Sequence, residues 1–359
     1  MEVTGSISFT SGGIMRPSHR SGGAVIVASA VLLLTACSAA QSALERGRNG
    51  PPGRAHRAGG QTAVADPAAV QADELGAVPV LMYHQLVAEP RSVYDRTPQD
   101  FRAELERLAR EGYVPVTARE FSSGKIDIPA GTHPVVLTFD DSTVSQFRLS
   151  TDGRPASDTA VGILLDVARK HPGFRPVATF FVNADPFREP GGRKPLDWLV
   201  KHEFEIGNHT LRHTALGTVD DATAQQAIAD NQRAITQAVP GLSVVSMALP
   251  NGSMSRSRQL VLEGAAGGVR YQHQGVYLVG ANPAPSPFST AFDPGAIPRI
   301  RSQAATGPEA QFTSTAWLDK LRDGTVRRYT SDGDPKTISF PKAEAASLAP
   351  AHRQAARPY

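Results

Sequence analysis

The sequence has little cysteine, few aromatic residues and a small net charge. Only one of the 359 residues is a cysteine, Cys37, so the chain can form no internal disulfide bond. Aromatic residues make up only 6% of the chain, and the formal net charge is only +3. No dense block of lysine and arginine interleaved with aromatic residues appears, and the basic residues are scattered as on a solvated surface. The composition therefore argues against a disulfide scaffold and against a nucleic-acid partner.

One apolar run near the N-terminus is too short for a transmembrane helix but has the length of a signal-peptide core. Residues 23–34 form this run, and they follow the basic residues Arg16 and Arg20. The next residues, Leu-Thr-Ala-Cys at 34–37, resemble a bacterial lipobox, where a signal peptidase cuts before a cysteine that carries lipid. We therefore predict a lipoprotein signal peptide over residues 1–36, lipidation of Cys37 and a lipid anchor in the cell membrane, on its extracytoplasmic face. The alternative is an ordinary secretory signal with an accidental cysteine.

The composition changes twice along the rest of the chain. Residues 37–76 hold almost no large apolar residue, so they cannot bury a core and are predicted to form a disordered tether. Residues 77–341 are predicted to be the folded domain, and residues 342–359 a disordered tail. Strands are expected near 78–83, 135–139, 177–182, 204–206, 244–249, 276–279 and 297–300, with helices from Thr97–Pro98 and over 158–170, 195–202, 218–239 and 255–266. This alternation predicts an α/β fold with a mostly parallel sheet, open or closed into a barrel.

Two short motifs contain residues suited to catalysis. Asp140 and Asp141 end the apolar run over 134–139, and His209 and His213 follow later at a spacing of four. Together they supply three ligands for one divalent metal ion and one further carboxylate as a base, which indicates a metal-dependent hydrolase. Each motif alone has a structural alternative, because the aspartates can form a turn or a helix cap and the histidines can be an incidental pair.

Three segments resemble the polysaccharide deacetylase family, which is carbohydrate esterase family four with the NodB-homology domain. They are Leu-Thr-Phe-Asp-Asp at 137–141, Ala-Thr-Phe-Phe-Val at 178–182, and Glu-Ile-Gly-Asn-His-Thr at 205–210 followed by His213. The resemblance covers roughly residues 78–301. It implies a distorted (β/α) barrel of about seven strands that removes N-acetyl or O-acetyl groups from polysaccharides. It also implies a metal held by Asp141, His209 and His213, with Asp140 as the general base.

The general acid is not evident from the same motifs. Many family members take it from a histidine in a late strand, but only His273 and His352 follow His213 here, and neither lies in such a strand. The segment Pro-Val-Leu-Met-Tyr-His-Gln at 79–85 resembles instead the early Tyr-His motif of a circularly permuted subgroup that includes poly-N-acetylglucosamine deacetylases. This resemblance assigns the acid to His84. The alternative is a buried strand histidine.

The segment Met-Ala-Leu-Pro-Asn-Gly at 247–252 departs from the family's third motif, which usually has an aromatic residue or arginine before Pro-Tyr-Gly. The arginine that orients the base in many members is absent, and Asn251 replaces the tyrosine. Arg299 or Arg301 is therefore a candidate partner of Asp140. The backbone N–H of Asn251 is a candidate oxyanion donor, because this segment borders the site in the family.

Together these features predict a lipid-anchored, metal-dependent deacetylase that hydrolyses N-acetyl groups of a cell-surface or extracellular polysaccharide. The expected cofactor is Zn²⁺, with Co²⁺, Ni²⁺ or Mn²⁺ as alternatives, because imidazole and carboxylate ligands do not select sharply among these ions. Two other functions stay open: an O-acetyl esterase acting on a xylan-type glycan, and a catalytically silent glycan-binding lipoprotein. The sequence names neither the polymer nor the oligomeric state.

Overall fold

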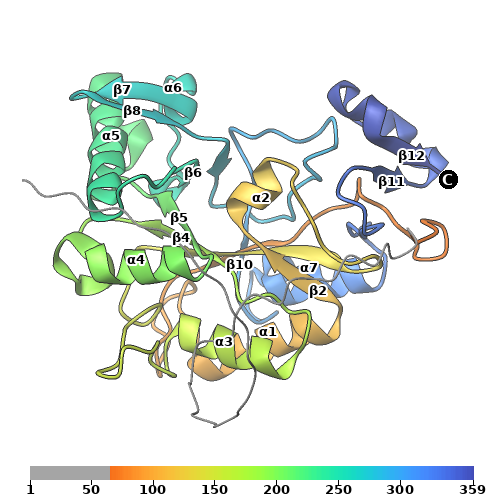
Figure 1. The fold of residues 1–359 in the computed structure, drawn as a ribbon, viewed down its shortest axis with the longest axis horizontal. Helices are drawn as coiled ribbons and strands as arrows, with labels where there is room; N and C mark the ends of the chain where they lie inside the picture. The colour runs from red at the N-terminus through yellow and green to blue at the C-terminus, as the bar shows by residue number, and fades with distance from the viewer. Residues whose placement is uncertain (1–64) are drawn as a thin grey trace, which may run out of the picture. The chain divides into compact units, whose positions relative to one another are not determined.

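The computed structural model describes residues 65–359 (Figure 1). The predicted signal peptide, the predicted lipidation site Cys37 and most of the predicted tether lie outside these residues. Within the described part, eight strands form one parallel sheet in the order β10-β1-β3-β4-β5-β6-β9, with β2 paired to β3. The strands are β1 (Val80–Tyr83), β2 (Tyr113–Val116), β3 (His133–Asp140), β4 (Thr179–Val182), β5 (Glu205–Asn208), β6 (Ser246–Ala248), β9 (Gly275–Tyr277) and β10 (Ile300–Arg301).

Strand β3 shows how the sheet buries both of its faces. Successive side chains of a strand point to opposite faces. Val135, Leu137 and Phe139 belong to the apolar cluster shared with the helices, whereas Val136 belongs to a second cluster with Phe181 of β4. All eight residues of β3 are buried, which explains the continuous apolar run in the sequence. The fold is the expected distorted (β/α) barrel.

Helices cover the outer side of the sheet, and α1 and α3 pack against each other there (Figure 1). Helix α1 begins as predicted, with Pro98 in its first turn and the Thr97 hydroxyl accepting the Asp100 N–H at 3.0 Å. Helix α5 is capped by Asp220 rather than by Thr218, because the Asp220 carboxylate accepts the Thr223 N–H at 2.7 Å. The helices are α1 (Pro98–Arg110), α2 (Ala118–Ser122), α3 (Ala160–Lys170), α4 (Arg193–Lys201), α5 (Asp221–Ala238), α6 (Gln259–Leu262) and α7 (Ser314–Arg322).

The helix predicted over residues 255–266 is wrong. Only α6 is helical there, and β7 (Glu263–Ala266) forms an antiparallel hairpin with β8 (Val269–Gln272). Gly267 and Gly268 form the two-residue turn, and their φ angles of 55° and 78° are those that a type I′ hairpin turn requires. Strand β2 was not predicted at all, because Pro115 within it weakens the strand pattern.

Both ends of the described chain are ordered, in contrast to the predicted tether and tail. Glu74, inside the predicted tether, is buried, and Asp73 forms a β-bridge with Thr330. Residues 342–359, predicted to be a disordered tail, contain two 3₁₀ helices and β12 (Ala356–Pro358), which pairs with β11 (Ile338–Phe340). The backbone hydrogen bonds of that pairing hold a segment with few large apolar residues. Among residues 65–359, no helix combines the length and hydropathy needed to cross a membrane.

Candidate active site

Asp140 ends strand β3 at the carboxyl edge of the sheet and is almost fully buried. The guanidinium of Arg299 lies against it with two hydrogen bonds, Nη1 to Oδ1 at 2.7 Å and Nη2 to Oδ2 at 2.7 Å. Arg299 is fully buried and is itself held by the Leu278 carbonyl, which accepts from Nε at 2.7 Å. This bidentate geometry fixes the orientation of the carboxylate and of the guanidinium together.

The charge of Arg299 sets the protonation state of Asp140. Burial alone would raise the pKa of this carboxyl, but the adjacent guanidinium of Arg299 holds the pKa of Asp140 well below its usual range. The carboxylate therefore stays ionised at neutral pH. The carboxylate is thus unprotonated and oriented for accepting a proton, although the guanidinium also makes it a weaker base.

Asp141, His209 and His213 come together next to this pair, from the ends of β3 and β5. The Nε2 atoms of His209 and His213 each lie 3.5 Å from Asp141 Oδ1. One ligand atom from each of the three residues lies within 4.8 Å of the others. Burial lowers the pKa of His213, which favours the neutral imidazole that metal binding requires.

The donor atoms of these three residues fit a divalent metal ion. His209 Nδ1 lies 2.8 Å from the Ala248 carbonyl oxygen, so Nδ1 carries the proton and Nε2 presents its lone pair to Asp141 and His213. Nε2 is buried and has no hydrogen-bond partner among the described residues. An unpaired acceptor beside a carboxylate and a second imidazole suits the nitrogen and oxygen ligand sets of Zn²⁺.

The turns that carry the three ligands adopt strained backbone conformations. Asp141, Thr210 and His213 have φ angles of 72°, 56° and 52°, which non-glycine residues rarely adopt. Asn183 supports the turn after β5, since its Nδ2 donates to the carbonyls of His209 at 2.7 Å and Thr210 at 2.8 Å. Asn183 was not predicted from the sequence, although its position directly after the apolar strand β4 is a signal that points to it.

His84 follows β1 and approaches Asp140 from the opposite side to β4, with His84 Nε2 lying 3.9 Å from Asp140 Oδ2. Its side chain is 17% exposed, and its ring contacts that of Tyr94 at a centroid distance of 4.9 Å. Burial lowers the pKa of His84, while the charges of Asp140 and Asp141 oppose that shift. A histidine beside a fixed carboxylate and open to a cleft has the placement that an acid requires.

Gln146 ties the strand of the candidate acid to the strand of the candidate base. Its fully buried side-chain Nε2 donates to the backbone carbonyl of His84 at 2.8 Å and also to that of Asp140. Nothing in the sequence singled out Gln146, because its two partners lie on different strands.

The two remaining candidates are placed differently. Arg301 does not contact Asp140; it lies 5.5 Å from the centre of the Tyr94 ring and forms an ion pair with Glu309. Asn251 lies in a 3₁₀ turn (Pro250–Gly252) three residues after Ala248, with an exposed side chain and a φ of 55°. Its side chain forms no hydrogen bond with the site in the described part of the chain. Its role as an oxyanion donor stays a prediction.

An open cleft of about 770 Å³ leads to the site. His84 and Asp141 line it together with the loop between β1 and α1. It is lined by His84, Gln85, Val87, Ala88, Glu89, Arg91, Ser92, Tyr94, Asp95 and Asp141. The residues that could act on a ligand therefore face a space large enough to hold one.

Comparison with known proteins agrees with this geometry. Residues 127–266 match the model of the polysaccharide deacetylase family. Among solved structures, BC0361, a polysaccharide deacetylase from Bacillus cereus, has a TM-score of 0.51 at 17% identity, covering 68% of this chain and 69% of its own. BA0330 from Bacillus anthracis has a TM-score of 0.50 at 18% identity, covering 67% of this chain and 69% of its own. At such identities the two structures show the fold alone, and no curated protein sequence matches the chain.

The family match contains Asp140, Asp141, His209 and His213 but neither His84 nor Arg299. His84 directly follows β1, and Arg299 directly precedes β10; these two strands pair with each other, and β1 also pairs with β3. Two segments outside the matched residues thus complete the site. Residues 127–266 thus match the polysaccharide deacetylase family, and the fold and the residues gathered here agree with a hydrolase of that family.

Proposed function

We propose that this protein is a metal-dependent deacetylase that hydrolyses N-acetyl groups of a cell-surface or extracellular polysaccharide, and that it belongs to the permuted subgroup in which the acid lies on the first strand. The observation that supports this most is the arrangement around Asp140. Its carboxylate is held by Arg299 on one side, has His84 Nε2 at 3.9 Å on another, and directly precedes Asp141 of the three-residue ligand set.

Asp141, His209 and His213 would hold the metal ion, with Zn²⁺ as the proposed ion and Co²⁺, Ni²⁺ or Mn²⁺ as alternatives. When bound, a divalent ion supplies a Lewis acid next to the acyl carbonyl. The protein's part is to favour the neutral imidazole of His213 by burial and to orient His209 through the Ala248 carbonyl.

The other residues of the site are placed to move protons. Asp140 would accept a proton from the attacking water as the water oxygen bonds to the acyl carbon. Arg299 keeps Asp140 ionised and oriented before that step. His84, in its protonated form, would donate a proton to the sugar nitrogen as the carbon–nitrogen bond breaks. Acetate and the free amine are the products, and proton transfers of this kind contribute about 10²–10⁴-fold in rate.

The presence of His84 favours an amide over an ester as substrate. An amine leaves poorly unless it is protonated, whereas an alkoxide leaves more readily, so a placed acid matters more for N-deacetylation. The same site in an O-acetyl esterase would depend less on His84. A silent glycan-binding protein would have no need for a buried Asp140–Arg299 pair, which is costly to keep unless it is complete.

The test is release of acetate by the zinc-loaded protein from poly-N-acetylglucosamine oligomers and from acetylated xylan, with and without a chelator. We expect chelator-sensitive release from the amino sugar, and its loss in Asp140→Asn. The matched control is Asp152→Asn, because Asp152 is exposed in the loop after β3. Release from xylan alone would replace this proposal with the esterase, and metal binding without release from either would favour the silent binder.

We also propose that the protein is anchored in the membrane through lipid on Cys37, at the extracytoplasmic face. The proposal rests on the lipobox-like sequence at 34–37, which lies outside the described residues. Labelling of cells with a palmitate analogue should mark the wild-type chain and not Cys37→Ser. A labelled Cys37→Ser chain would rule the site out.

A further inference from the structure

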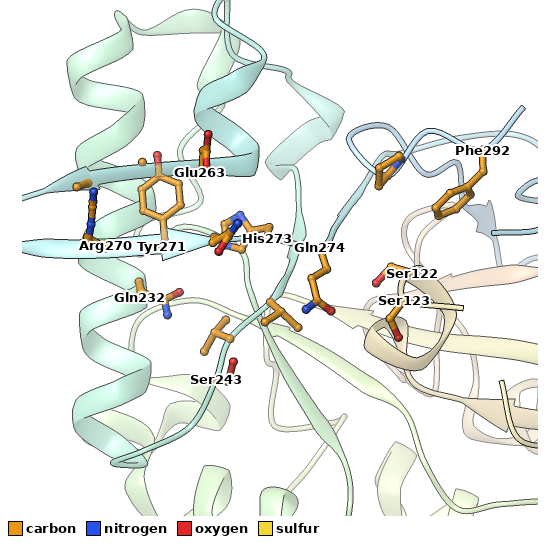
Figure 2. Close-up of a pocket in the computed structure, with 16 residues that line it drawn as sticks. Ser122, Ser123, Gln232, Ser243, Glu263, Arg270, Tyr271, His273, Gln274 and Phe292 are labelled. Atoms are coloured by element: carbon orange, nitrogen blue, oxygen red, sulfur yellow. The ribbon is translucent and has the colours of Figure 1, made fainter. Parts of the chain in front are cut away.

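A second and larger cavity, of about 1200 Å³, lies away from the candidate active site. It opens between the β7–β8 hairpin with α5 on one side and the end of α2 with the loop before β10 on the other (Figure 2). We call it the hairpin pocket. Its lining residues are Ser122, Ser123, Gln232, Ser243, Val244, Val245, Glu263, Gly264, Ala265, Arg270, Tyr271, Gln272, His273, Gln274, Phe292 and Pro294.

The hairpin pocket and the metal ligands lie at opposite ends of the same strand. Val245 lines the pocket and immediately precedes β6, whereas Ala248, the last residue of β6, holds His209 through its carbonyl. A strand of three residues spans about 10 Å. None of the lining residues belongs to the site described above, so the pocket needs an explanation of its own.

The walls of the hairpin pocket combine aromatic rings with uncharged polar groups. Figure 2 shows Tyr271 and Phe292 on opposite sides, with His273 and Gln274 between them. The remaining polar groups are mostly amides and hydroxyls, which both donate and accept hydrogen bonds. The only charged side chains in the lining are one acid, Glu263, and one base, Arg270, so the pocket has no net charge that would favour an ionic ligand.

Two of the lining side chains carry buried polar atoms without a hydrogen-bond partner. His273 and Gln232 are 4% and 8% exposed, and His273 Nε2 and Gln232 Oε1 have no partner among the described residues. His273 Nδ1 lies 2.6 Å from the Val261 carbonyl oxygen, so Nδ1 carries the proton and Nε2 is an acceptor. An unpaired buried acceptor is costly, at about 1–3 kcal/mol. Both acceptors are suited to donors such as hydroxyl groups.

We propose that the hairpin pocket binds a neutral, hydroxyl-rich stretch of the polysaccharide, as a second carbohydrate site separate from the catalytic cleft. Sugar rings present apolar faces to aromatic side chains and hydroxyls to amides and imidazoles, and the pocket offers the half-buried ring of Phe292 together with amide side chains and the imidazole of His273. Its volume exceeds that of an ordinary small-molecule site and suits several linked rings. Only the identity of the ligand as the substrate polymer rests on the proposed function.

The pocket would act by raising the local concentration of polymer at the catalytic cleft. A chain bound at one site finds the other by an intramolecular step, provided that it is long enough to reach both. A short oligosaccharide cannot reach both sites at once, so binding in the hairpin pocket does not raise its local concentration at the catalytic cleft. The pocket therefore predicts a dependence on polymer length that the catalytic cleft alone does not.

The first experiment compares poly-N-acetylglucosamine with its trisaccharide as substrates of the zinc-loaded full chain. The variant combines Gln274→Ala with Phe292→Leu, since leucine keeps apolar contact with Phe121 but removes the aromatic face. We expect KM for the polymer to rise about five- to tenfold, the loss expected for a few contacts, with kcat and the trisaccharide rates unchanged. Gln354→Ala, an exposed glutamine outside the pocket, is the control. Equal kinetics of variant and wild type on both substrates would overturn the proposal.

The second experiment separates the pocket from the proposed activity. Calorimetric titration of the full chain carrying Asp140→Asn with the neutral N-acetylglucosamine hexasaccharide should show two binding events, one of which disappears in the pocket variant. Binding that is unchanged by the pocket variant, or no binding, overturns the second site. Loss of one event without any acetate release by the wild type would leave the pocket standing and remove the deacetylase proposal.

Discussion

Two buried carboxylates in different regions of this molecule behave in opposite ways. Asp140 lies at the carboxyl edge of the sheet, and Glu74 lies where the two ends of the described chain meet. Burial raises the pKa of any carboxyl, and both side chains are nearly inaccessible to solvent. Yet the pKa of Asp140 is held well below its usual range, whereas that of Glu74 rises to about 8.

The difference lies in what surrounds each carboxylate. Asp140 faces the guanidinium of Arg299, which compensates its charge. Glu74 accepts from the Tyr329 hydroxyl at 3.0 Å and the Ser339 N–H at 2.8 Å, and the nearby carboxylate of Asp332 raises its pKa further. Neutral donors reduce the cost of a buried charge but do not remove it. Burial alone therefore does not keep a carboxylate ionised at neutral pH; the buried counter-charge does.

The largest effect is expected from Arg299→Leu, which should leave Asp140 buried without a counter-charge, so that its pKa is raised as that of Glu74 is. Removing one partner of a buried ion pair costs about 3–5 kcal/mol of unfolding free energy. The pKa of Asp140 should then rise above that in the unfolded chain, so the loss of stability should be larger at pH 8 than at pH 5. Acetate release should fall sharply. Urea unfolding at both pH values and a pH–rate profile measure these changes.

Arg301→Leu is the matched control for that variant. Arg301 lies two residues further along the chain but pairs with Glu309 rather than with Asp140. Replacing it should change the unfolding free energy by less than about 1 kcal/mol, as for other partly exposed ion pairs. Equal losses in the two variants, or a loss in Arg299→Leu that does not change with pH, would contradict the assignment of Arg299 as the counter-charge.

The next largest effect is expected at His84, whose Nε2 lies 3.9 Å from the ionised carboxylate of Asp140. His84→Asn should lower kcat on the N-acetylated oligomer by about 10²–10⁴-fold, the usual contribution of a general acid. Because burial lowers the pKa of His84 and only the protonated ring can donate, activity should fall as pH rises through that pKa. The variant should lose this alkaline limb. A change in KM alone, with the limb intact, would give the acid role to another group.

The motifs in the sequence were sufficient to predict the residues whose chemistry depends on local spacing. Asp140 and Asp141 follow a continuous apolar run, and His209 and His213 are four residues apart, so each pair is visible without knowledge of the fold. The alternation of strands and helices predicted a mostly parallel α/β sheet, and the family resemblance implied the barrel. The partner of Asp140 could be narrowed only to Arg299 or Arg301. These two arginines lie on one strand segment, and packing decides which of them is buried beside Asp140.

The residues that were missed act through partners distant in the sequence. Gln146 joins two strands through backbone carbonyls, and Asn183 holds the turn after β5 from the end of β4. The partners of Gln146 leave no local pattern, whereas Asn183 is marked only by its position directly after the apolar strand β4. The tail over 342–359 was misjudged for the same reason, because its order comes from pairing with β11 and from the Tyr359 hydroxyl, which donates to the Ala72 carbonyl at 2.8 Å. The hairpin pocket depends on the hairpin of β7 and β8, and the sequence favoured a helix over the residues of β7.

The smallest effect, and the sharpest test of the comparison, is expected from Glu74→Gln. The folded chain binds the Glu74 proton more tightly than the unfolded chain does, with a pKa of about 8 against an ordinary 4.5. The stability that Glu74 contributes is therefore full below about pH 4.5 and is lost as pH rises through 8. Glutamine keeps the shape without the charge, so Glu74→Gln should unfold at a higher urea concentration than the wild type at pH 9, by about a few kcal/mol of unfolding free energy, and with little difference at pH 5. Glu344→Gln, which removes only a partly exposed ion pair with Arg327 in the same region, should show no such rise with pH. A difference between Glu74→Gln and wild type that stays constant from pH 5 to 9 would mean that Glu74 is ionised throughout, and that neutral donors alone can hold a buried charge here.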